Sequence, residues 1–194
     1  MTENDGIMIM EKRDDMPWEV ISDILKKAHQ QHVDKGIVMS VPHMSPEELK
    51  EWMGEKGKCF VAMDGDRLVA TSSIIEKNLD RWYFKGKVSE LTMQGVLPAY
   101  QGMHIFSKIN KICEEEAVKG GYTAIYFDTA EANKNRINIG KREDYILVDY
   151  FWHKNHFSVG MMKWISQRPH SRFCYAIGFA IKKLYVKIRR FINR

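Results

Sequence analysis

The stretch that most constrains the fold is residues 95–117, GVLPAYQGMHIFSKINKICEEEA, which we interpret as a strand end, a tight turn and a helix start. Pro98 has no N–H group to donate to a sheet, so the strand should end there. Gly102 lets the backbone come close to a ligand. Beyond it, Ile105 and Ile109 begin a helical repeat of apolar residues. Because the first turn of a helix carries unpaired N–H groups and partial positive charge, this stretch predicts a phosphate-binding site.

The rest of the chain predicts a mixed α/β fold. Ser45, followed by Pro46 and two glutamates, predicts a helix start. Asp64-Gly65 predicts a hairpin turn between two short apolar strands. Strands are expected at residues 6–13, 59–63, 68–76, 87–96, 122–129, 145–153 and 157–165. Helices are expected from residues 16 and 45, after residue 104, over 132–142 and over 172–193.

Residues 96–105, VLPAYQGMHI, resemble the pyrophosphate-binding motif of the GNAT superfamily of N-acetyltransferases, V-x-P-x-(aromatic)-(R/Q)-x-x-G-x-(G/A). The positions that fit are Val96, Pro98, Tyr100, Gln101, Gly102 and Ile105. Two positions depart, since His104 stands where Gly is usual and Phe106 where Gly or Ala is common. The resemblance covers residues 6–165. It implies an α/β fold of the mixed α+β kind, with a central, mostly antiparallel, splayed sheet flanked by helices.

The same resemblance implies an acyl-CoA-dependent N-acyltransferase that moves an acetyl group from acetyl-CoA to a primary amine of a small molecule or protein, without a metal. The backbone of Gln94, Gly95 and Val96 would hold the pantetheine and the thioester. The other implied cofactor-binding residues are Gln101, Gly102, Met103, His104, Ile105, Phe106, Ser107 and Asn133. For Asn133, a simple helix-capping role is an open alternative.

Two carboxylates are candidates for the base that deprotonates the amine. Glu90 is the first, because it lies on the strand that leads into the motif, where several family members carry a catalytic Glu. Strict alternation would place it on one face with Thr92 and Gln94. Asp128, which ends a later strand, is the second candidate. The alternatives are an edge ion pair for Glu90 and a cap or loop role for Asp128.

The general acid has no clear candidate. Many family members carry a Tyr at the position that Gly140 occupies here. The thiolate could leave unassisted because the pKa of a thiol is low. A second possibility is a non-catalytic protein that binds CoA or acyl-CoA.

Composition excludes several other classes. The chain has 194 residues and three widely separated cysteines, which argues against a disulfide framework and for a cytoplasmic location. The beginning of the chain is acidic and does not resemble a signal peptide. The seven histidines have no accompanying Cys or acid cluster, so no metal site is expected.

The basic character of the chain comes from its end. Residues 172–194 hold seven basic residues and no acid, whereas the remaining chain has 23 basic and 25 acidic residues. We therefore expect an acyltransferase domain at residues 1–166 and a basic amphipathic helix at 167–194. Its apolar face could pack on its own domain or on a second subunit as a homodimer, or contact a membrane surface through residues 172–193. Nucleic acid is not an expected partner, because aromatic stacking residues and a known nucleic-acid fold are missing.

Overall fold

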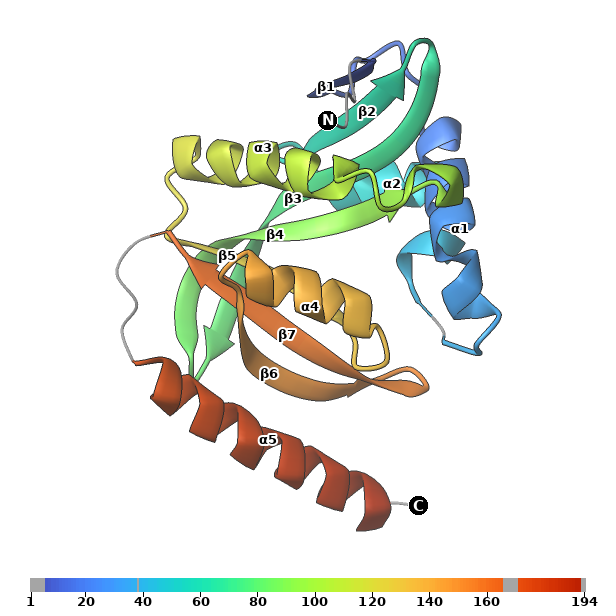
Figure 1. The fold of residues 1–194 in the computed structure, drawn as a ribbon. Helices are drawn as coiled ribbons and strands as arrows, with labels where there is room; N and C mark the ends of the chain where they lie inside the picture. Colours follow the sequence, from blue (N-terminus) through green and yellow to red (C-terminus); the bar gives the residue numbers. More distant parts are fainter. Residues whose placement is uncertain (1–5, 38, 166–170, 193–194) are drawn as a thin grey trace. The chain divides into compact units, whose positions relative to one another are not determined.

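The computed structural model describes residues 6–37, 39–165 and 171–192 (Figure 1). The strands are β1 (Ile7–Glu11), β2 (Lys58–Asp64), β3 (Arg67–Arg81), β4 (Phe84–Val96), β5 (Ala124–Ala130), β6 (Ile146–His153) and β7 (His156–Trp164). The α-helices are α1 (Trp18–Val33), α2 (Pro46–Met53), α3 (Ile105–Lys119), α4 (Lys134–Arg142) and α5 (Arg172–Ile192), and two short 3-10 turns are η1 (Val41–His43) and η2 (Pro98–Tyr100). The strands form one sheet in the order β1-β2-β3-β4-β5-β7-β6.

The contacts divide the chain into two units, and each is described by itself. The first holds residues 1–76 and 89–121, and the second holds residues 77–88 and 122–194. The long strands β3 and β4 pass from one unit into the other. The predicted mixed α/β fold is confirmed, and the pairs β1–β2, β2–β3, β5–β7 and β6–β7 are all antiparallel.

In the first unit, helices cover both faces of β4. A side chain added at Gly95 would lie 3.0 Å from the Cβ of Ala28 on α1, so this position faces α1. The neighbouring Gln94 side chain points the other way and donates to Asn110 Oδ1 on α3 at 2.8 Å. Successive strand residues alternate between faces, so α1 and α3 lie on opposite sides of the strand (Figure 1).

The hairpin and the helix start predicted in this unit are both confirmed. β2 ends at Asp64 and β3 begins at Arg67, which leaves Gly65 and Asp66 as a two-residue turn. Ser45 caps α2 through a capping box, in which its hydroxyl accepts from the Glu48 N–H and the Glu48 carboxylate accepts from the Ser45 N–H.

The second unit has its own hydrophobic core, to which β5, β6 and β7 contribute side chains. The core includes Tyr83 from the β3–β4 hairpin and Tyr175 from α5, both almost fully buried. The other members are Leu79, Val88, Ala124, Tyr126, Val148 and Met162. The sequence predicted strands at 68–76 and 87–96. In the structure both strands are longer and meet in a hairpin that includes residues 77–86. Its burial depends on residues far along the chain.

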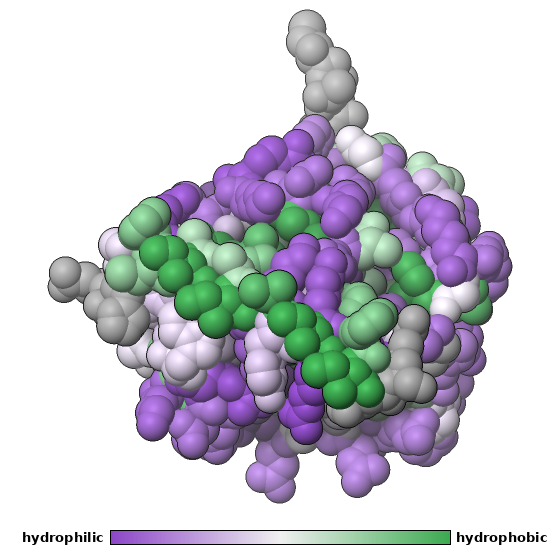
Figure 2. Space-filling model, turned by 90° about the horizontal axis from the view of Figure 1, so that it is seen from below, coloured by the Kyte–Doolittle hydropathy of each residue, from purple (hydrophilic) through white to green (hydrophobic). Residues whose placement is uncertain are grey.

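The helix α5 confirms the predicted helix at the end of the chain. Of the alternatives left open for its apolar face, packing on its own domain is not observed. The apolar side chains lie exposed in a band along it (Figure 2). The proposed domain boundary at residue 166 lies outside the described residues. In the part of the chain that the structure describes, no helix is long and apolar enough to cross a membrane.

Candidate functional site

The last residues of β4 depart from regular strand geometry. Met93 is buried and has a φ of 48°, a conformation that non-glycine residues rarely adopt. Strict alternation therefore does not hold across Met93, so the alternation that predicted a shared face for Gln94 with Glu90 and Thr92 is interrupted. Unusual backbone of this kind is concentrated at functional sites, where the surrounding packing holds it.

The backbone at this irregular position is tied to α1. His29 Nε2 donates to the Gln94 carbonyl at 2.8 Å, while His29 Nδ1 is buried without a hydrogen-bond partner. Desolvation lowers the pKa of His29, so the ring is neutral at pH 7. No local pattern connects His29 with residues 94–96, because His29 and Gln94 are 65 residues apart.

Two motif side chains fix the turn between β4 and α3. The Tyr100 hydroxyl donates to Asp64 at 2.7 Å, which connects η2 to the β2–β3 hairpin. The Gln101 side chain donates to the Val96 carbonyl at 3.3 Å and so spans the turn. The structure thus gives Gln101 a role in positioning the turn. Its predicted contact with a cofactor stays a prediction.

The turn ends at a helix N-terminus whose N-cap residue makes no side-chain cap hydrogen bond. His104 occupies the N-cap with a φ of 57°, its side chain is exposed, and the first turn of α3 holds no acidic residue. Gly102 has a φ of 83°, and a Cβ built there would meet no atom within 4 Å. The N–H groups of a first helical turn have no acceptor inside the helix, so this end of α3 suits an anion.

The helix α2 shows that an open N-terminus is not a general feature of the helices in this unit. The N-terminus of α2 carries the capping box and two acidic residues in the first turn, Glu47 and Glu48. The capping box uses an N–H group that an anion would bind, and the two glutamates would repel an anion. The N-terminus of α3 has no capping box and no acidic residue.

The remaining predicted cofactor-binding residues differ in how far their side chains are exposed to solvent. Val96 and Ile105 are buried and hold β4 and α3 in the core. Met103 and Ser107 are exposed and Phe106 is half-buried. Of the two positions where the family motif favours small residues, His104 is exposed and Phe106 is half-buried.

Glu90 lies in β4 and is only 7% exposed. A buried carboxylate is costly unless polar groups surround it, so the position is unusual for a surface ion pair. Burial is compatible with the predicted role of a base and with a structural role, and the assignment stays a prediction.

Asp128 lies on β5 and is paired with Gly160 of β7. Its side chain is accessible to solvent, but the surrounding protein limits its hydration and raises the pKa of its carboxyl. Lys77 and His153 oppose this rise in pKa. A carboxylate with a raised pKa is a better proton acceptor at neutral pH.

Asn133 and Gly140 lie at the start and near the end of α4. The Asn133 side chain caps the helix by accepting from the Arg136 N–H at 3.2 Å and donates to Thr129 Oγ1 at 3.3 Å. This is the capping role left open as an alternative for Asn133, and a cofactor contact stays a prediction. A Cβ at Gly140 would lie 2.9 Å from the Phe127 ring, so packing accounts for the glycine where the family often has Tyr.

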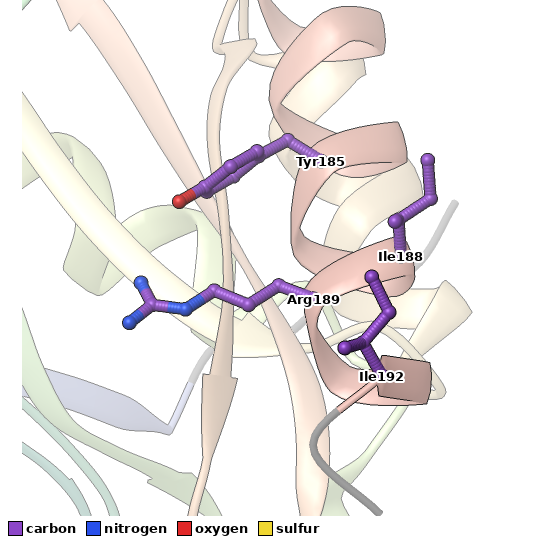
Figure 3. Close-up of a pocket in the computed structure, with 4 residues that line it drawn as sticks. All are labelled: Tyr185, Ile188, Arg189 and Ile192. Carbon is purple, nitrogen blue, oxygen red and sulfur yellow. The ribbon is translucent and has the colours of Figure 1, made fainter.

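Other sites can be set aside. Among the described residues, no three His, Cys, Asp or Glu side chains are grouped so as to hold a metal. A surface pocket on α5 is lined by Tyr185, Ile188, Arg189 and Ile192 (Figure 3). It includes none of the predicted catalytic or cofactor-binding residues.

The chain is an α/β protein in which an irregular strand end and a fixed turn lead to a helix N-terminus that suits an anion. A family model described as the acetyltransferase (GNAT) family matches residues 18–141, and the chain belongs to this family. A comparison with curated protein sequences finds no match.

Solved structures with the same fold include acetyltransferases. One from Streptococcus agalactiae has a TM-score of 0.65 at 15% identity and covers 83% of this chain and 99% of its own. A GNAT family acetyltransferase from Elizabethkingia anophelis with acetyl-CoA bound has a TM-score of 0.59 at 14% identity, with 84% and 100% covered. An aminoglycoside 6'-N-acetyltransferase complexed with coenzyme A has a TM-score of 0.61 at 19% identity, with 84% and 99% covered. At these identities the likeness concerns the fold.

Proposed function

We propose that the protein transfers an acetyl group from acetyl-CoA to a primary amine of a small molecule or a peptide. The observation that carries this proposal is the uncapped N-terminus of α3, which follows an open turn at Gly102. A diphosphate fits such a helix end because backbone N–H groups and the helix dipole both favour negative charge. Family membership supports the choice of coenzyme A, and two structures with this fold hold acetyl-CoA or coenzyme A.

In this proposal the chain's backbone does most of the binding. The N–H groups of residues 102–107 bind the diphosphate, and the backbone of Gln94, Gly95 and Val96 holds the pantetheine. His29 keeps the Gln94 carbonyl in place. Backbone contacts explain how the motif accommodates His104 and Phe106, since neither side chain has to touch the ligand.

The chain's carboxylates would handle the proton. An ammonium group must lose a proton before it can attack the thioester carbon, and Glu90 accepts it directly or through water. A C–N bond then forms, the C–S bond breaks with its electron pair going to the thiolate, and the second proton lost by the nitrogen passes to the thiolate or to water. Asp128 is the second candidate for the base, because its raised pKa suits the task.

The decisive assay measures thiol release from acetyl-CoA over a panel of polyamines, amino acids, amino sugars and peptides. The proposal expects turnover with at least one amine, and turnover that falls sharply in Glu90→Gln or in Asp128→Asn. Binding of acetyl-CoA, seen as a rise in Tm, should persist in both variants. No rise in Tm with wild-type protein at saturating acetyl-CoA would overturn the proposal.

A second candidate function is binding of CoA or acyl-CoA without catalysis. The observation that favours it is Gly140, where close packing against Phe127 and Met161 leaves no room for the Tyr that often serves as general acid. This alternative expects a rise in Tm with acetyl-CoA and no thiol release with any amine. Turnover that depends on Glu90 would exclude it.

A further inference from the structure

The side of α5 that faces the rest of the second unit carries charged side chains. Lys183 pairs with Glu131 at 2.5 Å, and Lys182 lies 3.9 Å from Asp149. Asp149 is almost fully buried, so its charge needs such neighbours. An amphipathic helix usually turns its apolar side to the protein, and α5 does the opposite.

Cationic side chains of α5 also lie over aromatic rings of the β6–β7 hairpin. The guanidinium of Arg190 lies 4.3 Å from the centre of the Trp152 ring, and Lys187 Nζ lies 5.8 Å from that of Phe157. Both distances are within the range of cation–π attraction. These contacts fix the second half of the helix.

The first half of α5 is fixed by packing. Tyr175 is completely buried in the core of the second unit, and its ring lies against Trp164 with the centroids 4.7 Å apart. Gly178 passes Trp82 so closely that a Cβ would lie 2.2 Å from the indole. The orientation of the helix about its own axis is therefore set along its whole length.

This orientation leaves a long apolar band on the outside, which we call the outer face of α5 (Figure 2). Leu184 is 62% exposed and Phe191 is 83% exposed. The other members are Phe173, Ile177, Ile181, Tyr185, Ile188 and Ile192, each at least 45% exposed. A continuous apolar surface of this kind marks an interaction site.

The charges around the outer face select its occupant. Arg189 flanks it and is exposed, and residues 172–194 contain no acid. If a second copy docked through the same face, its symmetry would bring basic flank against basic flank. An anionic lipid surface instead offers an apolar layer and negative headgroups together.

We propose that the outer face of α5 lies in the interface of an anionic membrane, with its apolar side chains among the acyl chains and its basic flanks at the headgroups. Figure 3 shows Tyr185 and Arg189 projecting to the same side of the helix, and both line one surface pocket with Ile188 and Ile192. Their polar tips can therefore reach phosphates while their stems stay in the apolar layer. This inference does not depend on the proposed acetyl transfer.

Vesicle co-sedimentation of the full chain tests the proposal. The probes are vesicles of phosphatidylcholine alone and of phosphatidylcholine with phosphatidylglycerol in equal parts. We expect pelleting with the anionic vesicles, at least tenfold less with the neutral ones, and a decline as salt shortens the screening length. Leu184→Glu should lower anionic pelleting at least tenfold, and Phe191→Glu gives a second, independent reading at a more exposed position.

Val118→Glu is the matched control, because Val118 is 55% exposed on α3 and receives the same change. It should pellet like the wild type. Equal pelleting of Leu184→Glu, Phe191→Glu and Val118→Glu would overturn the proposal. A lipid-free dimer in sedimentation velocity, lost in Leu184→Glu but kept in Val118→Glu, would also overturn it and assign the outer face to a second copy.

Discussion

Replacing Gly102 by Ala should weaken coenzyme A binding by more than it weakens the fold. Gly102 has a φ of 83° and open space where a Cβ would point. A side chain in this left-handed region costs about 1 kcal/mol of folding free energy. For a chain of this length, about 1 kcal/mol lowers Tm by roughly 2–4 °C.

Gly121→Ala is the matched control. Gly121 has a φ of 73°, and a Cβ placed there would likewise meet no atom within 4 Å, but it follows the opposite end of α3. Its substitution should therefore lower Tm by a similar amount. Because it lies away from the N-terminus of α3, it should leave ligand binding unchanged.

The assay is the rise in Tm on adding coenzyme A. At a concentration of about 100 times Kd, binding stabilises the folded state by about 2.7 kcal/mol. If the new methyl group weakens binding about tenfold at the same concentration, roughly 1.4 kcal/mol remains. The rise in Tm should thus fall to about half in Gly102→Ala and stay whole in Gly121→Ala. An undiminished rise in Gly102→Ala would refute the assignment of the diphosphate to this turn.

Three further outcomes follow. Glu90→Gln should lower kcat by about 10²- to 10⁴-fold while the rise in Tm with acetyl-CoA persists; unchanged kcat would remove Glu90 as the base. The pKa of His29 is lowered by burial, so the unfolded chain takes up a proton below about pH 6.5 that the folded chain does not, and stability is lost as pH falls. His29→Gln should reduce the loss of stability between about pH 7 and pH 5 in thermal melts, and an unchanged slope would contradict this account. Gly140→Ala should lower Tm, because the new methyl group would meet the buried Phe127 ring. In an open helix position the same change usually raises the free energy of unfolding by about 1 kcal/mol. A higher Tm would show that the packing around Gly140 can relax.

Local signals in the sequence were sufficient for much of the first unit. The Asp64-Gly65 turn and the Ser45 cap each depend on residues close together in the chain, and both are confirmed. The uncapped start of α3 was also readable, because Pro98 and Gly102 interrupt the pattern just before the helical repeat begins. The start of α3 therefore follows from residues close to it in the chain.

Features that depend on distant residues could not be predicted. The bond between His29 and the Gln94 carbonyl joins residues 65 positions apart, and nothing near either residue signals it. The positive φ of Met93 is held by tertiary packing around a residue type that gives no local sign of it. The basic side of α5 turns inward because Asp149 and Glu131 lie opposite it on other elements, whereas the amphipathic pattern alone favoured the reverse.

Amide hydrogen exchange with and without coenzyme A tests the central claim most directly. The account predicts that exchange slows in a peptide covering residues 102–107, where backbone N–H groups would bind the diphosphate, and stays unchanged at the capped start of α2 around residues 45–48. Bound coenzyme A that leaves exchange at residues 102–107 unaltered would contradict it.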